Sequence, residues 1–189
     1  MKKLITLFSF LIVSAFSLEA LAQDYNLQNR TGFGLHLGHY QAQDAEEGSM
    51  FVGVQLRSIG EMLGAELSAE YRGDQRYRIE GGDLTVRQIP VTGSLLLFIP
   101  VGESFAPYGL AGLGVYYTVY DYDEGFLDPG DETYTNFGYH LGLGADIAVS
   151  EDASINVDYR YLFLDGNNES LDNKSFSGNL FTAGITFYF

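Results

Sequence analysis

The chain lacks cysteine and tryptophan altogether, and among its 189 residues only 10 are Lys or Arg, against 25 Asp or Glu. Without cysteine there is no disulfide, no thiolate zinc site and no thiol-linked lipid anchor. A formal net charge of −15 argues against nucleic acid as a partner, because phosphate binding requires a cationic surface. Glycine is abundant instead, with 23 residues, and so are Tyr and Phe, with 14 each.

The N-terminal residues have the layout of a secretory signal peptide. Met1–Lys3 is a short cationic start, Leu4–Leu18 is mostly apolar, and Ala20–Ala22 is a small-x-small cleavage site. A transmembrane anchor is the alternative, but the apolar run is shorter than the roughly 20 residues that a helical span requires. We therefore expect cleavage after Ala22, export of the protein, and a single mature domain over 23–189.

Beyond this segment the hydrophobicity alternates with a period of two, which predicts β-strands. In residues 137–149 every odd position is apolar or aromatic, and no even position carries a large apolar side chain. The same alternation predicts eight strands, at 31–40, 50–58, 64–72, 84–98, 106–120, 135–149, 153–164 and 178–189. The connectors alternate between long, acidic segments and short turns, which predicts an up-and-down meander with all long loops at one end.

Two all-β folds fit this pattern: a soluble lipocalin-like barrel with its apolar face inside, and a membrane barrel with its apolar face outside. Several strands reach the length of a tilted bilayer-crossing strand. The less apolar face is rich in glycine, as a cramped lumen requires, at Gly34, Gly38, Gly112, Gly114, Gly138, Gly142, Gly144 and Gly184. Aromatic residues gather near strand ends, as in interfacial girdles, at Tyr71, Tyr108, Tyr116, Tyr117, Tyr120, Tyr159, Tyr161, Phe187 and Phe189. These features predict an eight-stranded antiparallel up-and-down transmembrane β-barrel whose first and last strands pair.

Several segments resemble small outer-membrane barrels of the OmpA-like and opacity-like kind. Residues 107–117, 138–149 and 155–163 are similar to strands five, six and seven of such barrels. The C-terminal segment is similar to the signal that these barrels present to the barrel assembly machinery, with alternate side chains at Phe181, Ile185, Phe187 and Phe189. The resemblance implies the cell outer membrane of a Gram-negative-type bacterium, with outer-membrane lipid and lipopolysaccharide as surroundings. It implies no particular activity, because the family includes structural, adhesive and channel proteins.

The fourth strand departs from the ideal, because Pro90 cannot donate a hydrogen bond to a neighbouring strand. Alternation would place Arg87 on the same lipid-facing side as Ile89 and Val91. Two explanations remain open: Arg87 lies above the membrane on an extension of the strand, or a bulge near Pro90 resets the alternation.

Charged side chains on the inward face are the main candidates for function. Alternation places seven of them in the lumen: Arg57, Glu66, Glu70, Arg72, Asp146, Asp158 and Arg160. The uncharged Gln55 and Asn156 and the histidines His36 and His140 accompany them. The short turns predict that Arg57 lies close to Glu66, and that Gly144 and Gly142 make room for Asp158 and Arg160. Because buried charges must be paired, the set favours a salt-bridge plug; a gate or a narrow ion path is the alternative.

The sequence contains little that indicates a catalytic site or a cofactor site. Some eight-stranded outer-membrane enzymes deacylate lipid A with a lipid-facing His-x-Ser arrangement. Here His140 is followed two residues later by Gly142 and points inward, and His39 is followed by Gln41. No serine can be argued to stand opposite either histidine, so we expect neither an enzyme nor a cofactor.

One long connector is dense in carboxylates, at Asp121, Asp123, Glu124, Asp128, Asp131 and Glu132. It fails the EF-hand calcium spacing, because Gly125 stands where a ligand is needed and Phe126 replaces the turn glycine. We expect a solvated acidic loop that could contact a surface ligand, with weak divalent bridging to lipopolysaccharide as a minor alternative.

The sequence therefore predicts a non-catalytic barrel with a structural or surface-interaction, adhesin-like role. A narrow channel or porin for ions or small solutes is the second hypothesis. A lipid-modifying enzyme and a soluble lipocalin-like binder are the remaining ones.

Overall fold

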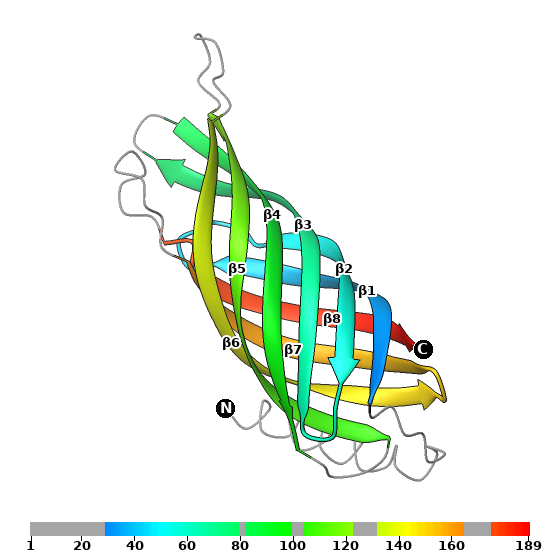
Figure 1. Cartoon of the computed structure of the whole chain (residues 1–189). Coiled ribbons are helices and arrows are strands. Elements are labelled where there is room, and N and C mark those ends of the chain that lie inside the picture. Colours follow the sequence, from blue (N-terminus) through cyan, green and yellow to red (C-terminus); the bar gives the residue numbers. More distant parts are fainter. Residues whose placement is uncertain (1–28, 80–81, 100–103, 123–131, 165–174) are drawn as a thin grey trace, which may run out of the picture.

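The computed structural model describes residues 29–79, 82–99, 104–122, 132–164 and 175–189. Eight antiparallel strands form one closed barrel in sequence order (Figure 1), which confirms the predicted fold class. The strands are β1 Arg30–Ala42, β2 Ser49–Ile59, β3 Leu63–Ile79, β4 Gly82–Phe98, β5 Phe105–Tyr122, β6 Glu132–Ser150, β7 Ala153–Leu164 and β8 Gly178–Tyr188. In this part of the chain, no helix has the length and apolar character needed to cross a membrane.

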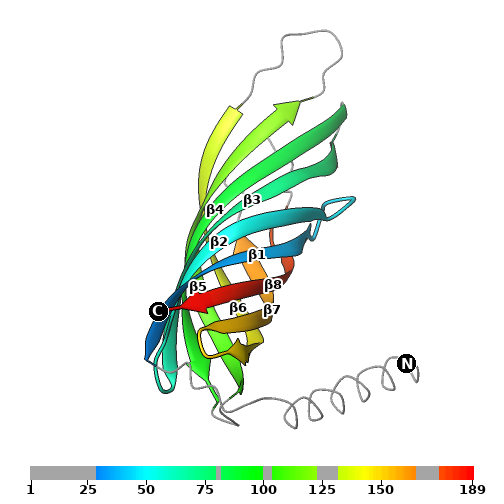
Figure 2. The ribbon, with the colours of Figure 1, turned by 90° about the vertical axis from the view of Figure 1, so that its right-hand side faces the viewer.

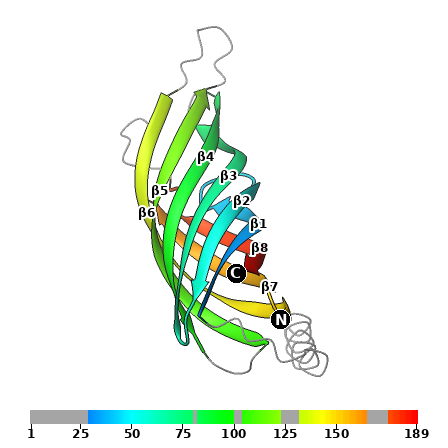
Figure 3. The ribbon, with the colours of Figure 1, turned by 45° about the vertical axis from the view of Figure 1, so that its right-hand side comes forward.

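The barrel closes where β1 pairs with β8, from Gly32–Tyr188 to Ala42–Gly178; the two strands lie side by side in Figure 3. Following the paired residues once around the barrel from Gln88 on β4 leads back to Phe98, ten residues further along the same strand. This stagger tilts the strands by about 35–45° to the barrel axis. Side chains that meet at one height in the lumen therefore come from strands that are far apart in the sequence.

The apolar face of the sheet points outward. Leucines on four different strands are more than half exposed: Leu37 (55 %), Leu67 (55 %), Leu95 (68 %) and Leu143 (65 %). A water-soluble surface does not carry such a continuous apolar belt, whereas a membrane barrel requires one. The soluble lipocalin-like alternative is therefore wrong for this chain.

The lumen is apolar at both ends. The first cluster lies toward the long connectors and is called the loop-end cluster here; it contains Tyr40, Ala42, Phe51, Val86, Tyr116, Leu162, Leu164, Phe176 and Leu180. The second lies toward the short turns and is called the turn-end cluster; it contains Ile59, Leu96, Phe98, Tyr108, Leu110, Ala148 and Tyr188.

The predicted aromatic girdle is wrong for Tyr108 and Tyr116, which are buried in the lumen at 2 % and 1 % exposure. They lie on the even-numbered, inward face of β5, where Gly114 leaves room for the Tyr116 ring and Gly144 on β6 leaves room for the Tyr108 ring. The other predicted girdle residues whose side chains are described lie on the outer face, exposed at Tyr71, Tyr117, Phe187 and Phe189 and half-buried at Tyr159 and Tyr161. The side chain of Tyr120 lies outside the described residues.

Six strands, β1 to β6, are longer than predicted, and β3 is extended the most. The predicted connector 73–83 is wrong, because β3 continues to Ile79 and β4 begins at Gly82. Likewise β5 continues to Tyr122 and β6 begins at Glu132. In Figure 2, β3 to β6 rise beyond the ends of the other strands. Outside the membrane neither face of a strand needs to be apolar, so the alternation that marks the membrane-spanning part fades.

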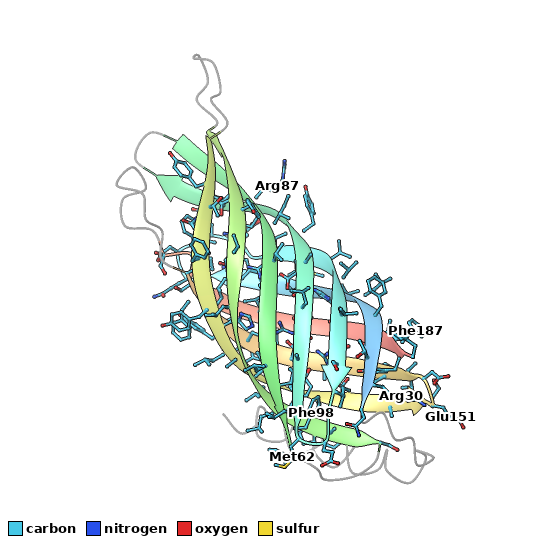
Figure 4. The ribbon with its side chains drawn as sticks, viewed as in Figure 1. Arg30, Met62, Arg87, Phe98, Glu151 and Phe187 are labelled. Atoms are coloured by element: carbon cyan, nitrogen blue, oxygen red, sulfur yellow. The ribbon has the colours of Figure 1, made fainter. Side chains whose placement is uncertain are left out.

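Pro90 interrupts the pairing of its strand on the β3 side only, where the pairs of Ile89 and Pro90 are missing. The β4–β5 register is continuous through the Pro90–Tyr116 pair, and the register shift lies on β3, between Arg72 and Gln75. A bulge at Pro90 is therefore the wrong explanation, and Arg87 is exposed on the outward face (Figure 4). Ten residues separate Arg87 from Leu97 on β4; on a strand tilted by about 40° they span roughly 25 Å, the height of a barrel's apolar band. Arg87 thus lies at the outer edge of this band, as the strand-extension explanation requires.

The close packing of the inward glycines makes a paired prediction. A Cβ added to Gly144 would lie 2.6 Å from both Val157 O and Asp158 Cβ, whereas a Cβ added to the outward Gly93 meets nothing within 4 Å. We expect Gly144→Val to lose about 1–3 kcal/mol through overpacking and Gly93→Val to fold normally. The measurement is the fraction of compact, heat-modifiable protein on a gel after refolding; equal folding of both variants would contradict this packing.

Candidate functional site

The lumen contains all seven charged residues that the alternation assigned to it, and none is more than 6 % exposed. They come from β2 and β3 on one side and from β6 and β7 on the other. The tilt of the strands brings these two sides together across the lumen. Among these seven residues, three arginines face four carboxylates, so the charges nearly balance.

Arg57 anchors the part of the network near the short turns. Its register partner on β3 is Glu66, as the sequence predicts, and Nε of Arg57 donates to Glu66 Oε2 over 3.1 Å. On the opposite side Nη1 lies 2.8 Å from Asp146 Oδ2, and Asp146 also accepts a hydrogen bond from Ser154 Oγ at 2.9 Å. The guanidinium lies 5.3 Å from the centre of the Tyr108 ring. Arg57 thus links β2 and β3 to β6 across the turn-end half of the lumen.

Glu66 joins this group to Arg160. Its Oε1 accepts from Arg160 Nη2 at 2.8 Å, while its Oε2 is bound to Arg57. Arg160 also donates from Nε to Asp158 Oδ1 at 2.5 Å. One carboxylate therefore holds two buried arginines, which makes Glu66 the centre of the network.

A second group lies nearer the loop end. Arg72 donates from Nη2 to Glu70 Oε2 at 2.8 Å, and His36 Nε2 lies 3.6 Å from Glu70 Oε1. The Arg72 guanidinium lies 4.5 Å from the centre of the Tyr40 ring and 5.5 Å from that of Tyr116. The cation is thus enclosed by one carboxylate and by aromatic faces, which favour a cation through their quadrupoles.

Glycines on β6 make room for the long side chains of β7. Arg160 pairs with Gly142 and Asp158 with Gly144, as the sequence predicts. A Cβ on Gly142 would lie 3.0 Å from the Cα of Arg160. Small and large residues therefore alternate across neighbouring strands.

Uncharged polar side chains bond to one another between the two apolar clusters. Gln55 Nε2 donates to Asn156 Oδ1 at 2.9 Å and to Thr186 Oγ1 at 2.8 Å. Ser68 and Thr92 hydroxyls lie 2.8 Å apart. These pairs extend the polar network around the lumen wall.

One serine contradicts the sequence-based expectation. Ser94 Oγ lies 2.9 Å from His140 Nε2, across Gly112 on the strand between them. The sequence reveals this pair only if the register of three neighbouring strands is known. Gly112, whose position leaves space between the two side chains, is the one local sign of it. Ser94 and His140 are 5 % and 3 % exposed, so they face the closed lumen and not the lipid, where the deacylase arrangement would require them.

The centre of the lumen is nearly filled. A cavity of about 10 Å³ lies between Glu70, Arg72, His140 and Arg160. A water molecule needs a cavity of at least about 10–15 Å³, so this space holds one water at most. An ion that crossed the barrel would also have to pass both apolar clusters.

The other predicted site residues lie outside the lumen. Phe181, Phe187 and Phe189 of the C-terminal signal are 57–81 % exposed on the outer face and Ile185 is 36 % exposed; Phe187 points away from the barrel in Figure 4. Asp121 lies within β5, and Glu132 is the first residue of β6. The acidic loop is therefore shorter than predicted. Asp123, Glu124, Asp128 and Asp131 lie outside the described residues.

Comparison with known proteins places the chain in a family. A model of the outer membrane protein beta-barrel domain matches residues 8–189, and the chain belongs to this family. No curated protein sequence matches it. The protein is therefore a small outer-membrane β-barrel, and barrels of this family are typically non-catalytic.

Solved structures share the fold at low sequence identity. Neisserial surface protein A (NspA) matches with a TM-score of 0.64 at 14 % identity, over 85 % of this chain and 96 % of its own. The outer membrane protein OprG from Pseudomonas aeruginosa matches with a TM-score of 0.56 at 20 % identity, over 89 % and 99 %. Ail, the attachment invasion locus protein of Yersinia pestis, matches with a TM-score of 0.55 at 14 % identity, over 86 % and 100 %.

The central position of Glu66 makes a prediction about stability. In Glu66→Ala, Arg57 and Arg160 both lose a buried partner, so we expect a loss of about 3–5 kcal/mol in the free energy of unfolding. The control is Asp152→Asn, which breaks the exposed Arg30–Asp152 pair (2.6 Å) and should cost less than about 1 kcal/mol. Urea unfolding in phospholipid vesicles measures both. Similar losses in the two variants would rule out a special role for Glu66.

Proposed function

We propose that this barrel is a non-conducting, non-catalytic outer-membrane protein with a structural and surface-interaction, adhesin-like role. The observation that carries the proposal is the packing of the described lumen: buried ion pairs lie in its middle, and an apolar cluster lies toward each end. Ser94 and His140 are 5 % and 3 % exposed and face the lumen, which argues against a lipid-modifying enzyme. The proposal includes removal of residues 1–22 as a signal peptide; they lie outside the described residues.

The elements for surface contact are the parts of β3 to β6 beyond the closed barrel. On its β2 side, β3 pairs only as far as Arg72, and on its β7 side, β6 pairs only from Gly138 onward, within the described residues. The segments beyond these residues carry the acidic connector 123–131. Because longer connectors of such barrels lie outside the cell, these segments support a surface role.

Charge favours a cationic partner. A structure of Ail holds the heparin analogue sucrose octasulfate, a polyanion. The present chain has a formal net charge of −15, and the described β1–β2 connector adds the exposed carboxylates Asp44, Glu46 and Glu47. Repulsion between like charges argues against a sulfated glycan and favours a basic surface.

Attachment of cells tests the surface role. Bacteria that express the barrel should attach to a poly-lysine surface more strongly than cells without it, and heparin coating should give no gain. Replacing Asp123, Glu124, Asp128 and Asp131 by Asn or Gln should remove most of the gain, whereas neutralising Glu46 and Glu47 should remove less. Attachment that is indifferent to all of these changes would count against an adhesin-like role.

Conductance tests the closed lumen against the channel hypothesis. The refolded barrel in a planar lipid bilayer should show no steady current, with heat-dependent gel mobility as the folding control. Arg160→Ala should stay silent as well, because the apolar clusters remain. The channel hypothesis, which is the alternative function, gains if wild-type protein shows a steady, salt-dependent conductance that shifts in Arg160→Ala.

A further inference from the structure

The lipid-facing wall formed by β5 to β8 and β1 contains an apolar groove of about 730 Å³. Its floor follows one row of paired residues across four strands: Ala183, Val157, Ala145 and Pro107. Three of these four side chains, two alanines and a proline, project little from the sheet. The floor therefore lies lower than the rows of larger residues on both sides.

The two flanking rows are large and apolar. On one side Phe181, Tyr159 and Leu143 pair across three strands, and on the other side Ile185, Ile155 and Ile147 do the same. Residues on one face of a strand repeat every two positions, so each row stands about 7 Å from the floor. Phe181, Tyr159 and Leu143 line the groove directly, and it is wide enough for a single extended hydrocarbon chain.

The aromatic side of the groove is held in place. The Tyr159 hydroxyl donates to Asn179 Oδ1 at 2.6 Å, and the rings of Tyr159 and Phe181 lie 5.0 Å apart. Because the hydroxyl and the ring are both fixed, this side is shaped before any partner arrives. Preorganisation of this kind lowers the cost of ordering a bound chain.

Depth in the membrane indicates which lipid can reach the floor. Ala145 lies five residues before the end of β6, and Val157 lies four residues after the start of β7. These strands meet at the short turn Glu151–Asp152, and short turns of such barrels face the periplasm. On strands tilted by about 40°, four to five residues rise roughly 10–13 Å from the turn along the barrel axis, less than half of the hydrocarbon core of about 30 Å. The floor therefore lies mainly in the periplasmic leaflet, which consists of phospholipid.

We propose that this groove is a binding site for one acyl chain of a periplasmic-leaflet phospholipid. A hollow of the same volume on the opposite wall surrounds Gly93 and is lined by Leu67, Leu95 and Leu113. Leucine side chains have neither a hydrogen-bonding group nor a ring that would fix them, so this hollow serves as the matched comparison. Binding at the groove orders a chain; contact at the Gly93 hollow is ordinary fluid lipid.

Photolabelling tests the proposal. The full barrel is reconstituted in phosphatidylcholine vesicles that contain phosphatidylethanolamine with a diazirine near the end of one acyl chain. Labelling should concentrate on peptides with Leu143–Ala145 and with Ala183, at several times the level on peptides with Gly93. Ala183→Phe fills the floor and should remove most of this enrichment, whereas Gly93→Phe should leave it unchanged.

Several outcomes would overturn the site. Even labelling of both walls in wild-type protein would do so without any variant, so the test does not depend on how Ala183→Phe folds. Enrichment that persists in a folded Ala183→Phe barrel would also exclude it. Displacement of the label by added lipopolysaccharide would assign the groove to the outer leaflet, and cross-links between two barrels through Phe181 would assign it to a second copy.

Discussion

Every backbone N–H and C=O group inside a bilayer needs a partner within the protein, because hydrocarbon offers none. Pairing of β1 with β8 meets this demand along the whole seam, and at its turn end Phe189 N donates to Thr31 O over 2.9 Å. Closure with eight strands leaves an interior just wide enough for side chains. The width of the lumen then decides which residues can face inward, and glycine becomes as necessary there as arginine.

The ionic network follows from this narrow space. Taking charges out of water costs several kcal/mol per ion, so the network is a weak source of stability. Its physical effect is on register: a slip of β2 by one residue would turn Arg57 toward the lipid, where a charge costs about 2.5–3.5 kcal/mol or more. The pairing of Arg57 with Glu66 therefore favours the observed register over its nearest competitors, and the apolar clusters keep water away from both.

The sequence predicts most of this architecture, because alternation is a local signal. The bounds of β7 agree with those predicted, and the seven luminal charges lie on the faces that alternation assigned to them. Prediction fails where the signal is absent or not local. The sequence misses the extensions of β3 to Ile79 and of β6 to Glu132, because a strand beyond the membrane does not need an apolar face. The Ser94–His140 contact requires the register of three strands. Nearness to a strand end predicts an outward Tyr116, whereas its even position on β5 correctly indicates the lumen.

A closed lumen, as proposed above, would leave the outer surfaces as the sites of interaction. Inside, packing and charge pairing determine each side chain; on the wall, lipid solubility requires only that a side chain be apolar. The fold therefore does not determine the size and shape of the apolar side chains on the wall. The contrast between the stacked rings of Tyr139 and Phe163 (4.6 Å apart) and the low Ala183 row below them is not needed for membrane insertion. A difference in height between neighbouring rows of side chains on the lipid-facing wall gives a barrel with a closed interior a surface that can recognise a molecule within the membrane.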